Sequence, residues 1–217
     1  MSNNKKEAHT IRNPKEAWRI QDKEECIEWM KMTNNGWLFD RFNSLIQNDF
    51  DVVKTAVEIS PLVISKTGKK FRNDKRLIRI VIQSEPESFR YASKKLKRDK
   101  DFVMKMVKRD GNCLRYVHYS LCDCPDIILE AIKTKPNAYW HASEELKKNK
   151  EFTLEACKEC PLVYNYLLFE MQLDGDVIYQ VVSKEPNIWH SVPYIVQKNY
   201  YDCEEFLGTM RSQNIKG

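Results

Sequence analysis

The sequence predicts an all-α fold, an α-solenoid of about seven helical-hairpin repeats that are each 25 residues long. Three observations support this prediction. A proline or glycine recurs at one phase of the 25-residue register, apolar residues recur with helical spacing on both sides of it, and an Asp or Asn begins most repeats. Together these features describe one helical hairpin repeated along the chain.

The break inside each hairpin is predicted by the thirteenth repeat position. When position 1 is placed at residues 49, 74, 99, 124, 149 and 174, position 13 is occupied by Pro61, Pro86, Gly111, Pro136, Pro161 and Pro186. Proline keeps the residue before it out of the α region and fits into the first turn of the following helix. We expect Gly111 to make the same break through permissive dihedral angles.

The first helix of each repeat is predicted by repeat positions 4, 5, 8 and 9. These are apolar in successive repeats, as Val52, Val53, Ala56 and Val57 and then as Leu77, Ile78, Val81 and Ile82. This spacing places one apolar stripe on a helix. The Asp or Asn at most first positions is expected to be its N-cap.

The second helix is predicted by positions 16, 19 and 23, which again show helical spacing. They are Phe89, Ala92 and Leu96 in one repeat, Leu114, Val117 and Leu121 in the next, and Tyr139, Ala142 and Leu146 in the one after. We expect Gly68 to distort the second helix of its repeat. Both helices have about ten residues and would be unstable alone, so stacked repeats must bury one another's stripes.

The register divides the chain into a tail and capping segment at 1–23, a repeat domain at 24–198 and a partial repeat or cap at 199–217. Repeats begin near residues 24, 49, 74, 99, 124, 149 and 174. No apolar run approaches the roughly 20 residues of a membrane span, and the N-terminus lacks the apolar centre of a secretory signal. Seven cysteines without framework spacing indicate reduced thiols. We therefore expect a cytoplasmic protein, either of the producing cell or of a host cell.

The segments "FRYASKKLKRDKDFVMKMV" and "YWHASEELKKNKEFTLEAC" resemble the tandem repeats of an uncharacterised family, the domain of unknown function numbered forty-one sixteen. The likeness is clearest from about Asp74 to Glu159. The last repeats depart from it, since "YNYLLFEMQLDGD" and "WHSVPYIVQKN" replace the usual alanine-serine-leucine pattern. The resemblance implies repeated helical hairpins and brings no catalytic residues.

No motif in the chain predicts a reaction. Cys113, His118, Cys122 and Cys124 are close in sequence, but their spacing matches no common zinc finger. The CxxC at residues 157–160 lacks a thioredoxin-like strand context. "KTGKK" lacks the upstream glycine of a phosphate loop, and "DGD" is explained by helix capping. We expect a protein that is not an enzyme and that holds no metal and no cofactor.

The segment from Lys66 to Arg109 is strongly basic, with 16 Lys and Arg against five Asp and Glu. Such a block attracts phosphate backbones or an acidic protein face. It is equally typical of the solvated face of short helices, because Lys and Arg are good helix formers. The charge alone leaves these interpretations open.

The outer side of the second helices is the candidate partner-binding surface. Positions 17, 18 and 21 lie away from the core stripe, and they change from basic residues in earlier repeats to aromatic residues in later ones. Arg, Tyr and Trp dominate the energetics of protein interfaces. The candidate residues are Arg90, Lys94, Lys97, Arg98, Arg115, Tyr116, Tyr119, Trp140, His141, Phe169 and His190.

The leading hypothesis is a non-catalytic repeat protein that engages a macromolecular partner, a protein or a ribonucleoprotein, and acts by occupying its surface, as an inhibitor or a host-directed factor would. The alternative is a solenoid that binds RNA or single-stranded nucleic acid, using the basic 66–109 segment for phosphates and the aromatic residues for stacking. Protein is favoured because the charge is confined to about two repeats, whereas the aromatic residues extend over the following three. No membrane and no small-molecule substrate is expected.

Overall fold

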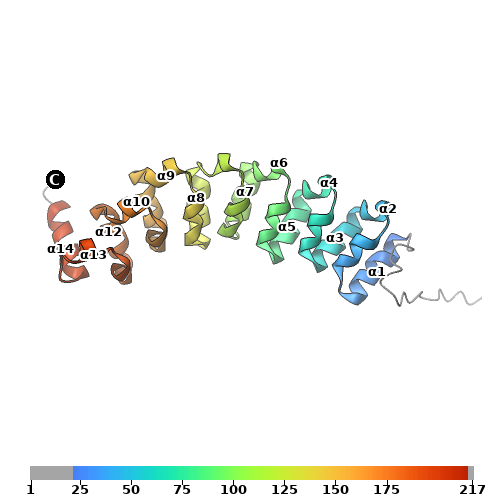
Figure 1. The fold of residues 1–217 in the computed structure, drawn as a ribbon, viewed down its shortest axis with the longest axis horizontal. Coiled ribbons are helices and arrows are strands. Elements are labelled where there is room, and N and C mark those ends of the chain that lie inside the picture. Colours follow the sequence, from blue (N-terminus) through green and yellow to red (C-terminus); the bar gives the residue numbers. More distant parts are fainter. Residues whose placement is uncertain (1–21, 215–217) are drawn as a thin grey trace, which may run out of the picture. The chain divides into compact units, whose positions relative to one another are not determined.

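The computed structural model describes residues 22–214, and every regular element among them is a helix (Figure 1). The chain divides between Ser93 and Lys94 into two compact units, called here the first and second units. The predicted all-α class and the 25-residue register are confirmed, and the fold is an α-solenoid of tandem helical hairpins. The predicted tail lies almost wholly outside the described residues, and the domain boundaries stay predictions.

Each repeat begins with an α-helix of eight to eleven residues. In the first unit these helices are α1 (Lys23–Thr33), α3 (Phe50–Ile59) and α5 (Lys75–Ser84). In the second unit they are α7 (Lys100–Val107), α8 (Pro125–Thr134), α10 (Lys150–Glu159) and α12 (Gly175–Val182), followed by α14 (Cys203–Asn214). Within each unit, consecutive members of this set lie side by side in one layer (Figure 1).

The N-caps of these helices are the predicted polar residues. The Asp49 carboxylate accepts hydrogen bonds from the backbone N–H groups of Asp51 and Val52. Asp74, Asp99, Asn149 and Asp174 cap their helices in the same manner. Such side chains satisfy donors that have no partner inside the helix. Cys124 makes no such bond, and Pro125 begins its helix instead.

The second half of each repeat is two short elements, not the single ten-residue helix that the apolar spacing predicts. A 3-10 helix begins at the turn residue, and a short helix follows after a break of two residues. In the first unit the pairs are η2 (Gly36–Arg41) with α2 (Ser44–Gln47) and η3 (Pro61–Lys66) with α4 (Lys69–Arg72), and η4 (Pro86–Tyr91) ends the unit. The second unit starts with α6 (Lys94–Lys97) and continues with η5 (Gly111–Tyr116) and η6 (Tyr119–Leu121), η7 (Pro136–His141) and α9 (Glu144–Lys148), η8 (Pro161–Tyr166) and α11 (Phe169–Gln172), and η9 (Pro186–Ser191) and α13 (Tyr194–Gln197).

The break has a local cause at repeat positions 19 and 20, where the backbone is extended. Ala142 and Ser143 have ψ angles of 153° and 157°. The Ser143 hydroxyl accepts a hydrogen bond from the Leu146 backbone N–H, so it caps the next short helix. Polar side chains that bond to nearby backbone groups compete with helix continuation. Gly68 is the N-cap of α4 at the same position, with ψ of 159°, so it sits in the common break and does not distort a continuous helix.

Gly111 acts through close packing, not through its dihedral angles, since no glycine of the described residues has a positive φ. A Cβ at Gly111 would lie 2.3 Å from the Ala131 carbonyl oxygen in α8. The Gly111 backbone N–H donates to the Thr134 hydroxyl across 2.7 Å. Gly36 has the same relation to the Ala56 carbonyl oxygen, also at 2.3 Å. The two glycines therefore allow the next first-layer helix to approach the turn.

The core of each unit lies between the layer of first helices and a second layer of 3-10 helices. Consecutive 3-10 helices contact one another within each unit, η2 to η4 in the first and η5, η7, η8 and η9 in the second. The stripe at positions 4, 5, 8 and 9 is buried, as predicted, in every repeat from Val52 to Val182. Leu96 and Leu146 at position 23 are buried, but Leu121 is only half-buried because η6 replaces the short α-helix in its repeat. The prediction of a buried Leu121 is therefore wrong.

A candidate partner-binding edge on the second unit

The short helices that follow the 3-10 layer form one edge of the stacked repeats. Within the second unit, the His118 backbone N–H donates to the Lys97 carbonyl across 3.0 Å, and Ser143 donates to Cys122 across 2.9 Å. Within the first unit, Ser93 donates to Arg72 in the same way, across 2.9 Å. In each case position 20 of one repeat bonds to position 24 of the repeat before it. These hydrogen bonds hold neighbouring repeats in register along the edge.

The side chain at position 20 also reaches back to position 25 of the preceding repeat. Ser143 Oγ lies 2.6 Å from Asp123 Oδ1, and Ser93 Oγ lies 2.6 Å from Asn73 Oδ1. At the corresponding place in the second unit, His118 Nε2 lies 2.8 Å from Arg98 Nη2. An imidazole and a guanidinium thus replace the hydroxyl and the carboxylate or amide of the neighbouring repeats.

The His118 ring is held as a neutral imidazole. Arginine has only donors, so the contact with Arg98 requires an unprotonated Nε2. Nδ1 lies 2.8 Å from Ser120 Oγ and 3.2 Å from the Ser120 backbone nitrogen. Desolvation and the positive charges of Arg98 and Lys94 lower the pKa of His118. The Tyr119 ring lies beside the imidazole, with 4.2 Å between the ring centroids. A basic side chain, an imidazole and an exposed aromatic ring are therefore in consecutive contact.

The basic candidates differ in how well their charges are compensated. Lys94 and Arg98 are exposed, as is Lys95 beside them, and none of the three forms an ion pair within residues 22–214. Lys97 is half-buried, and desolvation lowers its pKa. Arg90 belongs to the first unit, where its guanidinium lies 4.6 Å from the Tyr91 ring centroid and donates to the Tyr91 hydroxyl across 2.6 Å. Lys94, Lys95 and Arg98 thus form a group of exposed positive charges at the start of the second unit.

Two lysines on the first-helix layer of the second unit form ion pairs with the next repeat. Lys100 lies 3.2 Å from the Asp126 carboxylate of the next repeat. Lys150 lies 2.8 Å from Asp174 and 2.7 Å from Asp176, again in the next repeat. These ion pairs join consecutive repeats. They neutralise Lys100 and Lys150, whereas the exposed Lys105 of α7 forms no ion pair within the described residues.

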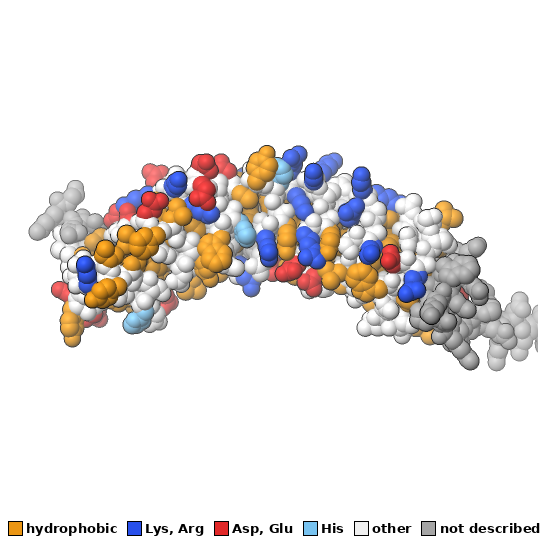
Figure 2. All heavy atoms as spheres, in the orientation of Figure 1, with side chains coloured by type: hydrophobic (Ala, Val, Ile, Leu, Met, Phe, Trp, Pro, Cys, Tyr) orange, Lys and Arg blue, Asp and Glu red, His pale blue; other side chains and the backbone are white. Residues whose placement is uncertain are grey.

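The aromatic candidates at positions 17 and 21 are exposed, as predicted. Tyr119, Trp140 and Phe169 are 79%, 60% and 64% exposed, and Tyr194, which occupies position 21 two repeats after Glu144, is 77% exposed. Exposed hydrophobic side chains, drawn in orange, gather on the part of the visible face that belongs to α8–α13 (Figure 2). The sequence register that identified Tyr119 and Phe169 also contains Tyr194, which is an additional member of the row.

Position 18 does not offer the open surface that was predicted. Tyr116 and His141 are half-buried. The Tyr116 ring lies 5.8 Å from the Arg115 guanidinium, and desolvation, followed by Arg115 and Lys147, lowers the pKa of His141. Both side chains are thus partly covered, and the charge of Arg115, from the preceding repeat, acts on His141.

Position 17 stays open to solvent in the same repeats. Arg115 and His190 are exposed there. The Trp140 ring is braced edge-on by Tyr166, at 5.1 Å between centroids and 87° between planes. Trp140 thus combines an exposed surface with a fixed orientation, a property that favours an interface anchor.

Acidic residues are close in sequence to these aromatic residues. Glu144 and Glu145 begin α9, and Glu170 follows Phe169. All three are exposed, and Glu144 pairs with Lys147 across 3.0 Å. The edge therefore changes from basic at α6 to apolar with interspersed carboxylates from α9 onwards.

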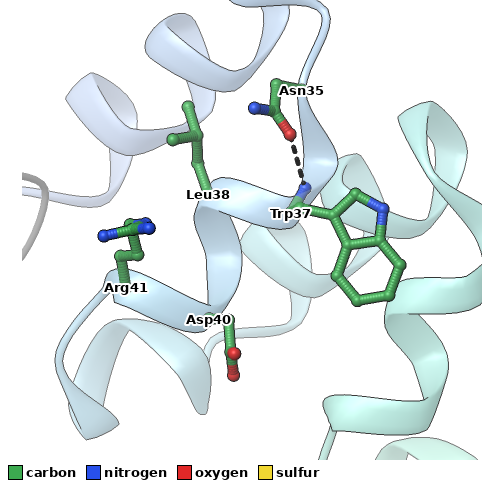
Figure 3. Close-up of a pocket in the computed structure, with 5 residues that line it drawn as sticks. All are labelled: Asn35, Trp37, Leu38, Asp40 and Arg41. Atoms are coloured by element: carbon green, nitrogen blue, oxygen red, sulfur yellow. Dashed lines mark hydrogen bonds between the residues drawn. The ribbon is translucent and has the colours of Figure 1, made fainter. Parts of the chain in front are cut away.

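A separate pocket of about 530 Å³ lies on the first unit, at η2, and sequence reasoning did not predict it. Asn35, Trp37, Leu38, Asp40 and Arg41 line it (Figure 3). The Asn35 side chain accepts from the Trp37 backbone N–H across 3.0 Å, while Trp37 and Arg41 point to opposite sides (Figure 3). Because its polar groups do not converge on one point, the pocket offers no catalytic arrangement. Of the lining residues, only the aromatic Trp37 could have drawn attention to this place from the sequence.

The cysteines do not assemble into a reactive site. All seven are free thiols, and Cys113 and Cys157 are buried. Desolvation raises the pKa of each of these two thiols to about 12, which disfavours the nucleophilic thiolate. Across the described part of the chain, no group of three His, Cys, Asp or Glu side chains is arranged to hold a metal ion. None of the helices described combines the length and apolar character needed to cross a membrane.

One family model matches the chain, described as Domain of unknown function (DUF4116), over residues 49–97, 74–122, 99–147 and 124–172. The four matches overlap and begin 25 residues apart, in the register of the hairpins. No curated protein and no solved structure matches the chain.

Proposed function

Because the chain belongs to the DUF4116 family of tandem repeats, for which no activity is defined, we propose a function from the exposed edge of its second unit. The protein is a non-catalytic binding module that engages a protein partner through this edge and acts by occupying the partner's surface, as an inhibitor would. We define the partner-binding edge as Lys94, Lys95, Arg98, Tyr119, Trp140 and Phe169.

The observation that carries this proposal is the exposure of large aromatic side chains at matching repeat positions. Single exposed hydrophobic residues are normal on protein surfaces. Here Tyr119 and Phe169 share position 21 in alternate repeats, and Trp140 stands at position 17 in the repeat between them. Contiguous exposed apolar side chains rimmed by polar residues are typical of protein interaction sites.

A nucleic-acid partner is the second candidate, favoured by the uncompensated charges of Lys94, Lys95 and Arg98. Phosphates would be attracted to these side chains. Glu144, Glu145 and Glu170 are exposed in α9 and α11, farther along the same edge, and would repel a phosphate backbone there. We therefore place a protein partner first.

The test is affinity capture with the whole chain as bait, with and without nuclease, followed by mass spectrometry. Wild type is compared with Trp140→Ala/Phe169→Ala and with the control Leu45→Ala, which truncates an exposed apolar residue of the first unit. A protein recovered by wild type and the control, nuclease-resistant and lost with the double variant, is the expected result. Recovery only of nuclease-sensitive material, or equal recovery by all three baits, would contradict the proposal.

A further inference from the structure

We infer that the partner segment recognised by the edge carries a cluster of Asp or Glu beside apolar side chains, and that it binds in one direction, with its acidic end at α6. This inference rests on the proposed function and specifies the chemistry of the same surface. It commits to a protein segment as the occupant.

The acidic end is assigned from charge complementarity. Lys94, Lys95 and Arg98 are exposed and have no carboxylate partner within the described residues, whereas Lys100 and Lys150 of the same unit are satisfied by the next repeat. Lys94 and Arg98 also lower the pKa of His118, so their positive charges act at one place. A carboxylate brought to this place would meet several donors, with no acidic residue of α6 to compete.

The acidic and apolar subsites are continuous. Arg98 contacts His118 at 2.8 Å, and the His118 ring lies 4.2 Å from the ring of Tyr119. The backbone bond from His118 to Lys97 holds the two repeats in this register, and the bond from Ser143 to Cys122 holds the following pair. One segment could therefore contact the basic side chains and Tyr119 together.

The apolar end of the bound segment is assigned to Trp140 and Phe169. Acidic residues of α9 and α11 determine the direction in which the segment binds. Trp140 is oriented by Tyr166, and Phe169 projects from the first position of α11. Glu145 and Glu170, exposed in the short helices α9 and α11 of the same part of the edge, would repel carboxylates of a segment bound in the reverse direction. Reversing the segment would also place its apolar side chains against solvated lysines.

The experiment is a selection of short random peptides displayed on phage against the full-length chain, followed by affinity measurements on the enriched peptides at low and high salt. The charge variant is Lys94→Glu/Lys95→Glu/Arg98→Glu. Its matched control, Lys105→Glu/Lys108→Glu/Arg109→Glu, makes the same change of net charge at exposed sites on and after α7. Trp140→Ala/Phe169→Ala tests the apolar end, and an oligouridylate is measured in parallel.

The expected result is enrichment of peptides that carry Asp or Glu on one side of Trp, Phe or Leu, in a single order. The charge variant should weaken their binding by roughly tenfold or more and remove the salt dependence, while the charge control leaves both unchanged. Reversing the order of a selected peptide should weaken its binding comparably.

Three outcomes would overturn the inference. They separate the case in which only the inference fails from the cases in which the proposed function fails as well. Peptides that require Trp140 and Phe169 but have no acidic residues would refute the acidic subsite and leave the proposed function standing. Peptides whose affinity is unchanged by the charge variant and by Trp140→Ala/Phe169→Ala would refute the inference and the proposed function together. Binding of oligouridylate with no enriched peptide, abolished by the charge variant, would identify the edge as a nucleic-acid surface.

Discussion

Arg98 and His118 form a cross-repeat contact, 2.8 Å from Nη2 to Nε2, at the place where Ser143 meets Asp123 one repeat later. The contact requires a neutral imidazole, because both partners would otherwise be cationic donors. It therefore couples the packing of two repeats to a titratable group on the edge proposed to bind a partner.

Acidification should break this contact. The pKa of His118 is lowered in the folded chain by desolvation and by Arg98 and Lys94, so the unfolded chain binds the proton more readily. The contribution of His118 to stability is present above its ordinary pKa of about 6.5 and is lost as the pH falls below it. Nuclear magnetic resonance should place the His118 midpoint below that of a model peptide, and Arg98→Gln should raise it. A His118 midpoint that does not respond to Arg98→Gln would contradict this account.

Gly111→Ala should destabilise the protein by on the order of 2–4 kcal/mol, because the new Cβ would lie 2.3 Å from the Ala131 carbonyl oxygen. Gly68→Ala is the matched control, since a Cβ there meets nothing within 4 Å. Its effect should stay within about 1 kcal/mol. Chemical denaturation of the two variants gives the comparison, and equal losses would show that the approach of α8 to Gly111 is not what requires glycine.

Ser88→Ala should stabilise the protein by about 1 kcal/mol. The Ser88 hydroxyl is buried and makes no hydrogen bond within the described residues, so its removal relieves a desolvation cost. The same repeat position holds Ala138 elsewhere, which shows that alanine fits there.

Thr153→Val should destabilise the protein, in contrast to Ser88→Ala, because the Thr153 hydroxyl has a buried hydrogen-bond partner. Thr153 Oγ1 lies 3.1 Å from the buried Tyr139 hydroxyl, and the loss of this bond should cost roughly 1–3 kcal/mol. Thermal unfolding should therefore move the two variants in opposite directions. A lower melting temperature for Ser88→Ala would mean that its hydroxyl has a partner.

Leu96→Ala should cost about 2–5 kcal/mol, because Leu96 is buried in α6. Leu121 occupies the same repeat position, but its side chain is half-exposed in η6. Leu121→Ala should therefore lower the free energy of unfolding clearly less. Lys95→Ala, on the exposed side of α6, should change the free energy of unfolding by no more than about 0.5 kcal/mol. Comparable losses for the two leucines would contradict the assigned difference in burial.

The sequence by itself determined the features that depend on local rules. Asp49 and Asp174 cap helices because their carboxylates lie next to unsatisfied backbone donors in the same segment. Pro61 and Pro136 end helices through their own ring geometry. The stripe that includes Val53 and Val182 follows from helical periodicity, and repetition of the pattern every 25 residues made the stacked-hairpin architecture predictable.

The tertiary structure decided what depends on the neighbouring repeat. The cap at Ser143 divides the predicted second helix, and the carbonyl of Ala131 explains a glycine whose own dihedral angles do not require it. The contact between Arg98 and His118, and the ion pair that neutralises Lys100 but not Lys94, join residues 20 to 26 positions apart. Periodicity shows which face of a helix is apolar, but these contacts depend on distances between repeats, which local sequence rules do not contain.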